Sequence, residues 1–379
     1  MKILHTSDWH VGKVLKGQSR ADEQIAVLGE IVQIARAEQP DLVIVAGDLY
    51  ETAAPTPEAT RIVTRALSAL RRTGAEVVAI AGNHDNGAAL DALRGWAEAA
   101  QITLRGTVRQ PKDHLISGVT AGGEPWRCVA LPFLSQRYAI RATEMFDLTG
   151  AEANQTYADH LRRVLAVLTE AFDHTAVNLI TAHLTVVGAT LGGGEREAHT
   201  IQAYAVPATV FPTSAHYVAL GHLHRRQAVN GPCPVHYSGS PIAIDFGEEE
   251  NAPSVLLAEV TADTPAKVRE IPLTAATPLR TVHGTVDELA ALETSDAWLR
   301  VYVRERPRAG LREQVQELLP RALEVRIDPD ALPEPDDPPR AQRAGRSPRD
   351  LFAAYLDERD HDDPAVQNLF DRLYAEVQQ

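Results

Sequence analysis

The chain has 379 residues, of which 44% are hydrophobic, and this is enough for a substantial core and for two or three domains. Its net charge of −14 argues against a uniformly basic nucleic-acid-binding protein. Two cysteines exclude a disulfide framework or a cysteine-based zinc site and favour the cytoplasm. The first apolar run is broken at His5, and the sequence holds no apolar run of about 18 residues, so neither a signal peptide nor a membrane span is expected.

Apolar, β-branched runs alternate with helical patterns in the first part of the chain. Strands are predicted at Lys2–Thr6, Leu42–Val45, Val77–Ile80, Val177–Thr181 and Tyr217–Leu220, and helices at 21–37, 58–72 and 151–172. Later strands are predicted at Val235–Ser238, Ser254–Val260 and Lys267–Pro272. This alternation indicates an α/β layered fold with a largely parallel core sheet that becomes mixed toward its end.

A second, smaller α/β unit is predicted after residue 275. It reads as strand 280–283, helix 286–293, strand 298–304, helix 309–318 and strand 323–327. The stretch 328–348 then holds six of the 24 prolines, which indicates a linker. We therefore expect four parts, at 1–275, 276–328, 329–348 and 349–379.

The last part is predicted to hold two helices, at 349–359 and 364–379. In the second, one apolar stripe is formed by Val366, Leu369, Phe370, Leu373, Tyr374 and Val377. The stripe predicts a partner helix pair, and packing back onto the chain's own domains is the alternative.

Polar motifs follow five of the predicted strands. In chain order they are Asp8-Trp9-His10, Gly47-Asp48-Leu49-Tyr50-Glu51, Gly82-Asn83-His84-Asp85, Ala182-His183 and Gly221-His222-Leu223-His224. Because ligands bind beyond the carboxyl ends of strands in α/β sheets, these side chains are expected to meet at one edge. The glycines before Asp48, Asn83 and His222 are expected to allow tight turns.

The residue types in these motifs suit a pair of metal ions. Carboxylate, amide and imidazole donors without thiolate favour manganese, iron or zinc over calcium or magnesium, and they argue against a structural zinc site. Two ions about 3.5–4 Å apart can clamp the attacking and leaving oxygens of a phosphoryl transfer. Each motif alone has a plain alternative, such as a turn at Gly47-Asp48 or a loop histidine at His183, but the five in order favour the metal site. The Gly192-Gly193-Gly194 run is interpreted as a flexible loop, because it lacks the ending of a phosphate-binding loop.

Residues 1–250 resemble the calcineurin-like metallophosphoesterases through these five motifs. Within that family the chain is similar to the SbcD nuclease subunits, in the run Ser7-Asp8-Trp9-His10-Val11-Gly12-Lys13 and then in Leu15, Gly17, Ser19-Arg20 and Glu23-Gln24. The resemblance implies a four-layer α-β-β-α sandwich, a DNA-capping domain at 276–328, and helices at 349–379 that dock on an SbcC-type ATPase.

The resemblance also implies a role for each motif residue. The first metal ion would be held by Asp8, His10, Asp48 and His224, and the second by Asp48, Asn83, His183 and His222. His84 would contact the scissile phosphate and assist the leaving oxygen, and Asp85 would orient His84. Glu51 receives no catalytic role, because relatives carry histidine or aspartate at its position.

The implied activity is manganese-dependent hydrolysis of DNA, as a 3′→5′ exonuclease and single-strand endonuclease, in end processing, repair, recombination, replication and hairpin cleavage. A hydroxide activated by two cations would attack phosphorus in line. Lys13, Lys16, Arg20 and Arg225 are candidate DNA contacts, with ordinary surface charge as the alternative. A homodimer through helices 58–72 and 88–100 and a nucleoid-associated place in the cytoplasm are also expected.

Two other functions remain open from the sequence. A small-substrate phosphoesterase would share the metal ions, but it would not explain the capping-like unit or the terminal helices. A non-catalytic scaffold would keep the fold, but such proteins tend to lose metal ligands, whereas every expected ligand position is filled here.

Overall fold

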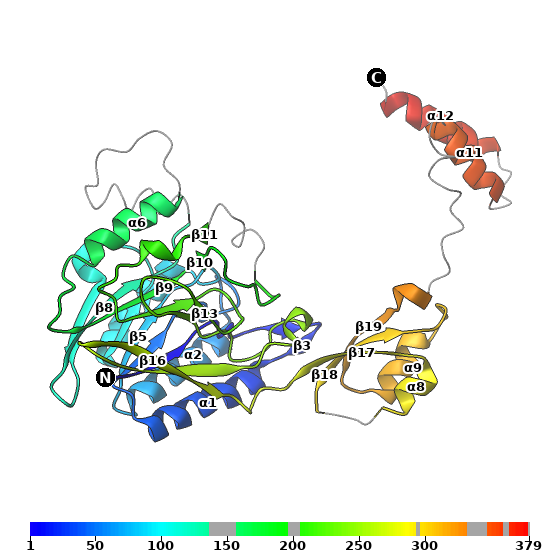
Figure 1. The fold of residues 1–379 in the computed structure, drawn as a ribbon. Coiled ribbons are helices and arrows are strands. Elements are labelled where there is room, and N and C mark those ends of the chain that lie inside the picture. The colour runs from blue at the N-terminus through cyan, green and yellow to red at the C-terminus, as the bar shows by residue number, and fades with distance from the viewer. Residues whose placement is uncertain (136–156, 196–204, 293–295, 332–346, 359–363, 378–379) are drawn as a thin grey trace.

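The computed structural model describes residues 1–135, 157–195, 205–292, 296–331, 347–358 and 364–377. Its largest part contains two six-stranded sheets that pack face to face (Figure 1). The first sheet has the spatial order β16 (Thr264–Pro272), β15 (Ser254–Thr261), β1 (Lys2–Thr6), β4 (Leu42–Val45), β5 (Glu76–Ile80), β6 (Ile102–Arg105). The second has the order β13 (Gln227–Val229), β14 (Val235–Tyr237), β12 (Tyr217–Gly221), β9 (Val177–His183), β8 (Pro125–Leu131), β7 (Leu115–Val119).

Both sheets are parallel at the centre and antiparallel at their edges. In the first sheet β1, β4, β5 and β6 run parallel, while β15 and β16 are antiparallel. In the second sheet β8, β9, β12 and β14 run parallel, while β7 and β13 are antiparallel. Buried apolar side chains such as Ile44, Val78 and Leu179 fill the space between the sheets. The expected parallel core with mixed edges is therefore present twice.

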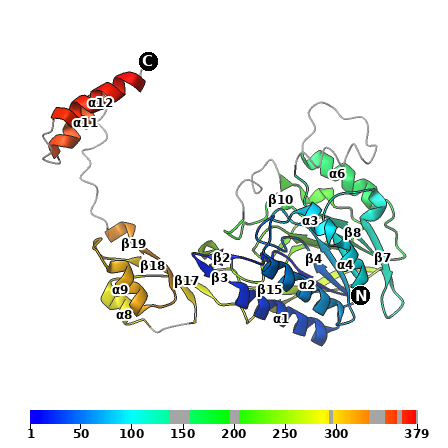
Figure 2. The same cartoon turned by 180° about the vertical axis from the view of Figure 1, so that it is seen from behind.

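Helices cover the two outer faces, which completes the four layers (Figure 2). The first sheet is covered by α1 (Ala21–Glu38), α2 (Pro57–Arg71), α3 (Gly87–Ala92) and α4 (Arg94–Ala99). The second is covered by α6 (Tyr157–Leu168) and the short turn η3 (Ala208–Val210). α2 begins at Pro57 because Thr56 accepts a hydrogen bond from the Ala59 N–H group and proline suits the first helical position. The four-layer sandwich is confirmed.

Short elements connect these layers. They are the hairpin β2 (Val14–Leu15) and β3 (Gln18–Ser19), the pair β10 (Thr185–Val186) and β11 (Ala205–Val206), and the turns η1 (Pro111–Asp113) and η4 (Phe246–Glu248). The segment 88–100 differs from its prediction, because it divides into α3 and α4 at Leu93. The start of the predicted helix 151–172 lies outside the described residues, and α6 ends at Leu168.

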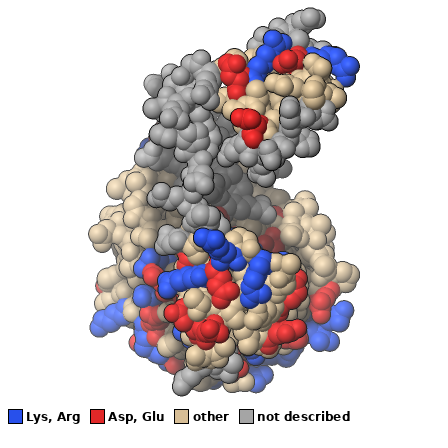
Figure 3. Space-filling view, turned by 90° about the vertical axis from the view of Figure 1, so that its right-hand side faces the viewer, with Lys and Arg blue, Asp and Glu red and all other residues tan. Residues whose placement is uncertain are grey.

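The smaller unit contains three parallel strands in the order β17 (Leu279–Gly284), β18 (Trp298–Val303), β19 (Ala322–Ile327). α8 (Val286–Ala290) and α9 (Leu311–Leu318) cover one face and share its core with Val301 and Val303. α8 is shorter than predicted, and a capping box between Thr285 and Glu288 begins it. Positive and negative side chains lie next to one another on this end of the molecule (Figure 3). The described chain then continues through the turn η5 (Pro329–Ala331).

The terminal helices α11 (Pro348–Glu358) and α12 (Pro364–Val377) form a pair that stands apart from the sandwich (Figures 1 and 2). The rings of Phe352 and Phe370 stack across the pair with centroids 4.0 Å apart. Most of the predicted proline-rich linker lies outside the described residues. Among the described helices, none combines the length and the apolar character that crossing a membrane requires.

Candidate metal centre

The predicted motifs converge where the strands of both sheets end. Asp8 and His10 follow β1, Asp48 follows β4 and Asn83 follows β5, all in the first sheet. His183 is the last residue of β9, and His222 and His224 follow β12, in the second sheet. The carboxylates and the imidazoles are buried, each with at most 3% of its surface exposed.

The backbone at this edge takes a conformation that side chains seldom adopt. Asp8, His10, Asp48 and His222 have positive φ angles of 53°, 46°, 51° and 101°. Such positions cost free energy and occur mainly where function requires a side chain to point in one direction. Four of the seven residues that the sequence assigns to metal binding therefore have a strained backbone.

The three glycines that precede expected ligands are required for different reasons. Gly47 has φ of +97°, as a tight turn requires. Gly82 and Gly221 do not have positive φ angles, so a turn at these positions would not by itself require glycine. They are needed because a Cβ atom at Gly82 would collide with Asp48, and one at Gly221 would collide with the Ala46 carbonyl.

One group of donors contains Asp8, His10 and His224, with one donor atom of each residue within 4.8 Å of the others. The Nε2 atoms of His10 and His224 lie 3.1 Å apart. The Asp8 carboxylate accepts the His222 N–H group at 3.0 Å, which fixes its place between the two sheets. This group matches the ligands expected for the first ion.

A second group contains Asp48, His183 and His222, again within 4.8 Å. Asn83 Oδ1 lies 2.9 Å from His183 Nε2 and 2.7 Å from His222 Nδ1, so Asn83 belongs to this group. Asp48 Oδ2 lies 3.4 Å from His183 Nε2 and 3.7 Å from His10 Nε2. Asp48 therefore stands between the groups, as a shared ligand must.

Three of the imidazoles are held at their Nδ1 atoms by oxygens of residues that are not expected metal ligands. His10 Nδ1 lies 2.9 Å from a Glu51 oxygen, His224 Nδ1 lies 2.5 Å from a Glu248 oxygen, and His183 Nδ1 lies 2.8 Å from the Ala46 carbonyl. Donation from Nδ1 leaves Nε2 with a lone pair toward the centre, which is the usual arrangement of metal-binding histidines. The donor set therefore fits two divalent ions.

The charges at the site are consistent with this arrangement. Burial would raise the pKa of the Asp48 carboxyl, but the neighbouring His183 and His10 hold that pKa well below its usual range. Burial likewise opposes protonation of His183 and His224, but Asp48 and Glu248 raise their respective pKa values to about 9. Asp48 and Glu248 thus favour positive charge on the imidazoles beside them.

His84 lies beside these groups. Its backbone N–H donates to Asp48 Oδ1 at 2.8 Å, its Nδ1 lies 2.7 Å from the Glu51 carbonyl oxygen, and its ring meets the His10 ring edge-on at 4.6 Å. The expectation that Asp85 orients this ring is wrong, because the Asp85 carboxylate accepts backbone N–H groups instead. These donors are Gly82 at 2.8 Å, Tyr50 at 2.9 Å and Leu49 at 3.1 Å.

The candidate DNA contacts have different surroundings. Arg20 is fully buried and bonds to Glu23 and the Ala243 carbonyl, so it cannot reach a nucleic acid and this prediction is wrong. Lys13 pairs with Glu51 at 3.0 Å and Lys16 with Glu324 at 3.3 Å, each partly exposed. Arg225 is exposed beside His224.

Sequence reasoning missed the carboxylates that hold the histidines. Glu51 received no role, and Glu248 was not singled out. Glu248 lies in η4 rather than after a strand, and 24 residues separate it from His224, so no spacing rule identifies it. Glu195 was also missed, and its carboxylate accepts the His224 N–H group at 3.0 Å.

Comparison with known families agrees with the fold and the site. A family model described as calcineurin-like phosphoesterase matches residues 1–226, and one described as type 5 capsule protein repressor C-terminal domain matches residues 275–378. The chain belongs to the calcineurin-like phosphoesterase family, whose members are hydrolases that use divalent metal ions. Within that family it is a member of the SbcD subunits, as its curated relatives indicate.

Three of these relatives are named as the D component of the nuclease SbcCD. That of Bacillus subtilis (strain 168) is 33% identical and covers 83% of this chain and 81% of its own length. That of Rhodobacter capsulatus is 34% identical, and the match covers 82% of this chain and 78% of the relative. That of Escherichia coli (strain K12) is 32% identical, and the match covers 77% of this chain and 73% of the relative. The similarity thus extends well beyond the metal-binding half.

Proposed function

We propose that this protein is the DNA-cleaving subunit of a two-component nuclease and that it hydrolyses phosphodiester bonds at a two-metal site. The observation that carries the proposal is the convergence of four buried imidazoles and two buried carboxylates, with three of the imidazoles held at Nδ1 by groups that are not expected ligands. DNA is proposed as the substrate because the relatives of this chain are named as parts of a nuclease.

Each residue of the site contributes a separate part of the chemistry. Divalent ions, when bound, would supply a nucleophile at neutral pH and neutralise charge that develops on the phosphate oxygens. Asp8, His10, Asp48 and His224 would hold one ion, and Asp48, Asn83, His183 and His222 the other. His84 would place its Nε2 against the leaving oxygen, because its Nδ1 is held by the Glu51 carbonyl. Manganese is the proposed metal, since the donor set mixes oxygen and nitrogen ligands.

Contacts to the DNA would be mainly to phosphates. Lys13, Lys16 and Arg225 are the proposed contacts, and the small unit at 276–328 would cap the bound duplex. We propose 3′→5′ exonuclease and single-strand endonuclease activity, without sequence specificity, because phosphate contacts carry no sequence information. A nucleoid-associated place in the cytoplasm follows from this substrate.

The helices α11 and α12 are proposed to dock on an SbcC-type ATPase. Two residues of the predicted stripe contact α11: Phe370 stacks on Phe352, and the Tyr374 ring lies 5.8 Å from the Arg349 guanidinium. Among the side chains that the structure describes in the pair, four large apolar ones are exposed: Leu351, Tyr355, Leu369 and Leu373. An exposed apolar face on two helices supports an interaction with a partner.

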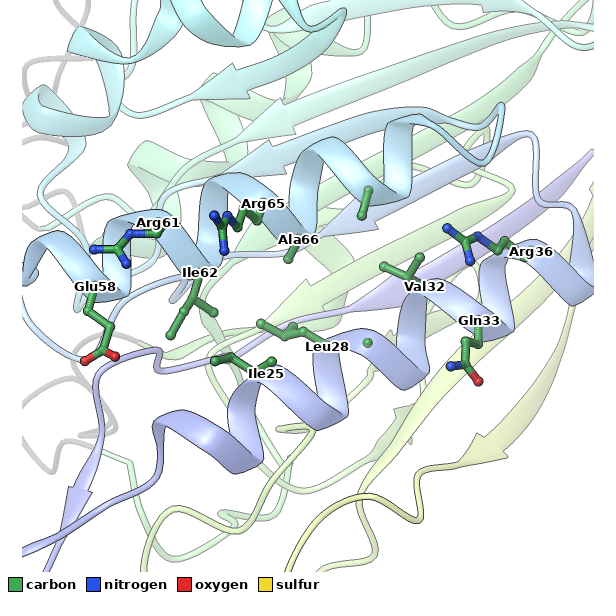
Figure 4. Close-up of a pocket in the computed structure, with 12 residues that line it drawn as sticks. Ile25, Leu28, Val32, Gln33, Arg36, Glu58, Arg61, Ile62, Arg65 and Ala66 are labelled. Carbon is green, nitrogen blue, oxygen red and sulfur yellow. The ribbon is translucent and has the colours of Figure 1, made fainter.

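A homodimer through the helices of the first sheet is also proposed. A groove of about 420 Å³ lies between α1 and α2 (Figure 4). Ile25, Leu28 and Ile62 line its floor, and Arg61 and Arg65 stand at its rim. Ile25 is 51% exposed, which supports a role for this surface in self-association.

A cleavage assay with manganese separates the proposed function from its alternatives. Linear duplex DNA and a chromogenic phosphodiester are offered to the wild-type protein and to Asp48→Asn, which removes the shared ligand charge. We expect the wild-type protein to cleave DNA, and we expect the rate of cleavage to be at least about a hundredfold lower in the variant. Turnover of the small ester alone would instead indicate a small-substrate phosphoesterase. A protein that binds no manganese and cleaves neither substrate would be a scaffold.

A further inference from the structure

Glu248 is a charged side chain with no exposed surface. Both of its oxygens are used: Oε1 lies 2.5 Å from His224 Nδ1, and Oε2 accepts the Ile244 N–H group at 2.8 Å. The position of the carboxylate is therefore set by the backbone, and the carboxylate in turn sets the direction of the His224 ring. The same ring directs its Nε2 toward His10 Nε2, at 3.1 Å.

The space around this pair is closed on the other side by the 192–195 segment. A Cβ atom at Gly194 would collide with Glu248 Oε1 and come within 3.1 Å of His224 Nδ1. Glu195 holds the His224 backbone N–H at 3.0 Å. Because there is no room for another arrangement, a shift of Glu248 must move the His224 ring.

The turn η4 that carries Glu248 contacts the small unit. Phe246 is 3% exposed and packs with Leu279 of β17, and the Arg300 guanidinium of β18 lies 4.6 Å from the centre of its ring. Both oxygens of Glu249 accept the Thr281 N–H group, each at 2.9 Å. Residues on either side of Glu248 thus contact the small unit, while Glu248 itself contacts a metal-facing histidine.

We propose that Glu248 is a positioning residue for His224 and that the docked small unit holds Glu248 in place, so that this unit stabilises the first metal position. The second position is independent of it, because His183 is held by the Ala46 carbonyl within the sandwich. The inference rests on the proposed two-metal function. It adds that the capping unit acts on the affinity for one of the two ions.

Manganese binding to the full chain without DNA tests the inference. Free Mn²⁺ is measured by its electron paramagnetic resonance signal during titration, which resolves two affinities when the sites differ. Glu248→Gln keeps the shape of the side chain, and we expect it to weaken one site by about 10–100-fold and to leave the other unchanged. Arg300→Met removes the charge above the Phe246 ring, and Arg300 lies outside the metal site. We expect this variant to weaken manganese binding at the same position by about two- to fivefold.

Arg326→Met is the matched control, because Arg326 pairs with Glu324 as Arg300 does but belongs to β19. It should leave both affinities unchanged. Unchanged affinities in Glu248→Gln and Arg300→Met would overturn the inference and leave the proposed function intact. An effect of Glu248→Gln alone would overturn the part played by the small unit. A wild-type chain that binds no manganese would overturn the proposed function itself.

Discussion

At the scale of single residues, the His84 ring is held at Nδ1 by a carbonyl oxygen that is not an expected metal ligand. Its Nδ1 is held by the Glu51 carbonyl, and its backbone by Asp48. Replacing the ring should therefore leave the metal groups in place. We expect His84→Ala to lower the rate of DNA cleavage by about 10²–10⁴-fold, because a positioned proton donor is lost.

The measurement is a manganese assay on duplex DNA together with a metal titration of the same variant. Retained metal binding with slow cleavage would agree with the role of His84. Undiminished cleavage would remove His84 from the mechanism, and loss of both ions would make it a ligand.

Asp85 joins two strand ends rather than taking part in the chemistry. Its carboxylate accepts three backbone N–H groups, which belong to Leu49, Tyr50 and Gly82. Asp85→Ala should lower the free energy of unfolding by about 2–3 kcal/mol, because these donors lose their acceptor. Chemical denaturation measures the change, and Glu317→Ala, at an exposed carboxylate on α9, should alter it by less than about 0.5 kcal/mol. A similar effect of both variants would contradict this role.

At the scale of elements, the pattern of the sequence predicts the strands that carry the site. Leu42–Val45 was predicted with the bounds that β4 has, because four consecutive large apolar residues stand between Asp41 and Ala46-Gly47. The expected ligands could be proposed for the same reason, since each lies at the end of such a strand or within four residues after it. Neither the pairing of two sheets nor the bond between Glu248 and His224 follows from local pattern, because both join segments that only the tertiary fold brings together.

α1 is hydrogen-bonded to the segment that connects the sandwich to the small unit. The Glu30 carboxylate accepts hydrogen bonds from the N–H groups of Thr274 and Ala275 and from the Thr274 hydroxyl, at 2.8–3.0 Å. Burial raises the pKa of Glu30, but these hydrogen bonds outweigh it, so the pKa is lowered. A lowered pKa stabilises the fold above the unfolded pKa of the group, and this contribution is lost as the pH falls through the folded value.

We therefore expect Glu30→Gln to lower the stability at pH 7 and to have less effect in acid. Glu30 is partly exposed, and solvent screening limits the loss to about 0.5–1 kcal/mol. Thermal unfolding of both proteins at pH 7 and at about pH 4 measures the difference. Glu259→Gln is the control, on an exposed carboxylate of β15. A difference that grows in acid would have the wrong sign.

At the scale of the whole molecule, the terminal helices offer a surface that the rest of the described chain does not cover. Leu369 and Leu373 are 45% and 50% exposed on α12. Changing both to Ser should weaken binding to the proposed ATPase partner by tenfold or more, because about 1.5–3 kcal/mol is gained for each apolar side chain that becomes buried. DNA cleavage by the isolated chain should not change. Asn368→Ser, on an exposed polar residue of α12, should leave partner binding intact, and unaffected binding by the double variant would exclude this surface.

The domain limits expected at 275 and 328 stay a prediction. The metal site, in contrast, has a clear relation to the architecture, because its seven expected ligands are divided between the two sheets. Asp8, His10, Asp48 and Asn83 come from the first sheet, and His183, His222 and His224 come from the second.

This division makes each bound ion a non-covalent cross-link between the two halves of the sandwich. An ion that binds only the folded state adds roughly 2.7 kcal/mol to the unfolding free energy at a hundred times its dissociation constant. Calorimetry with manganese should therefore show one sharp transition at a higher temperature, and a chelator should broaden it as the halves open separately. The site that performs the chemistry would then also make the sandwich melt as a single cooperative unit.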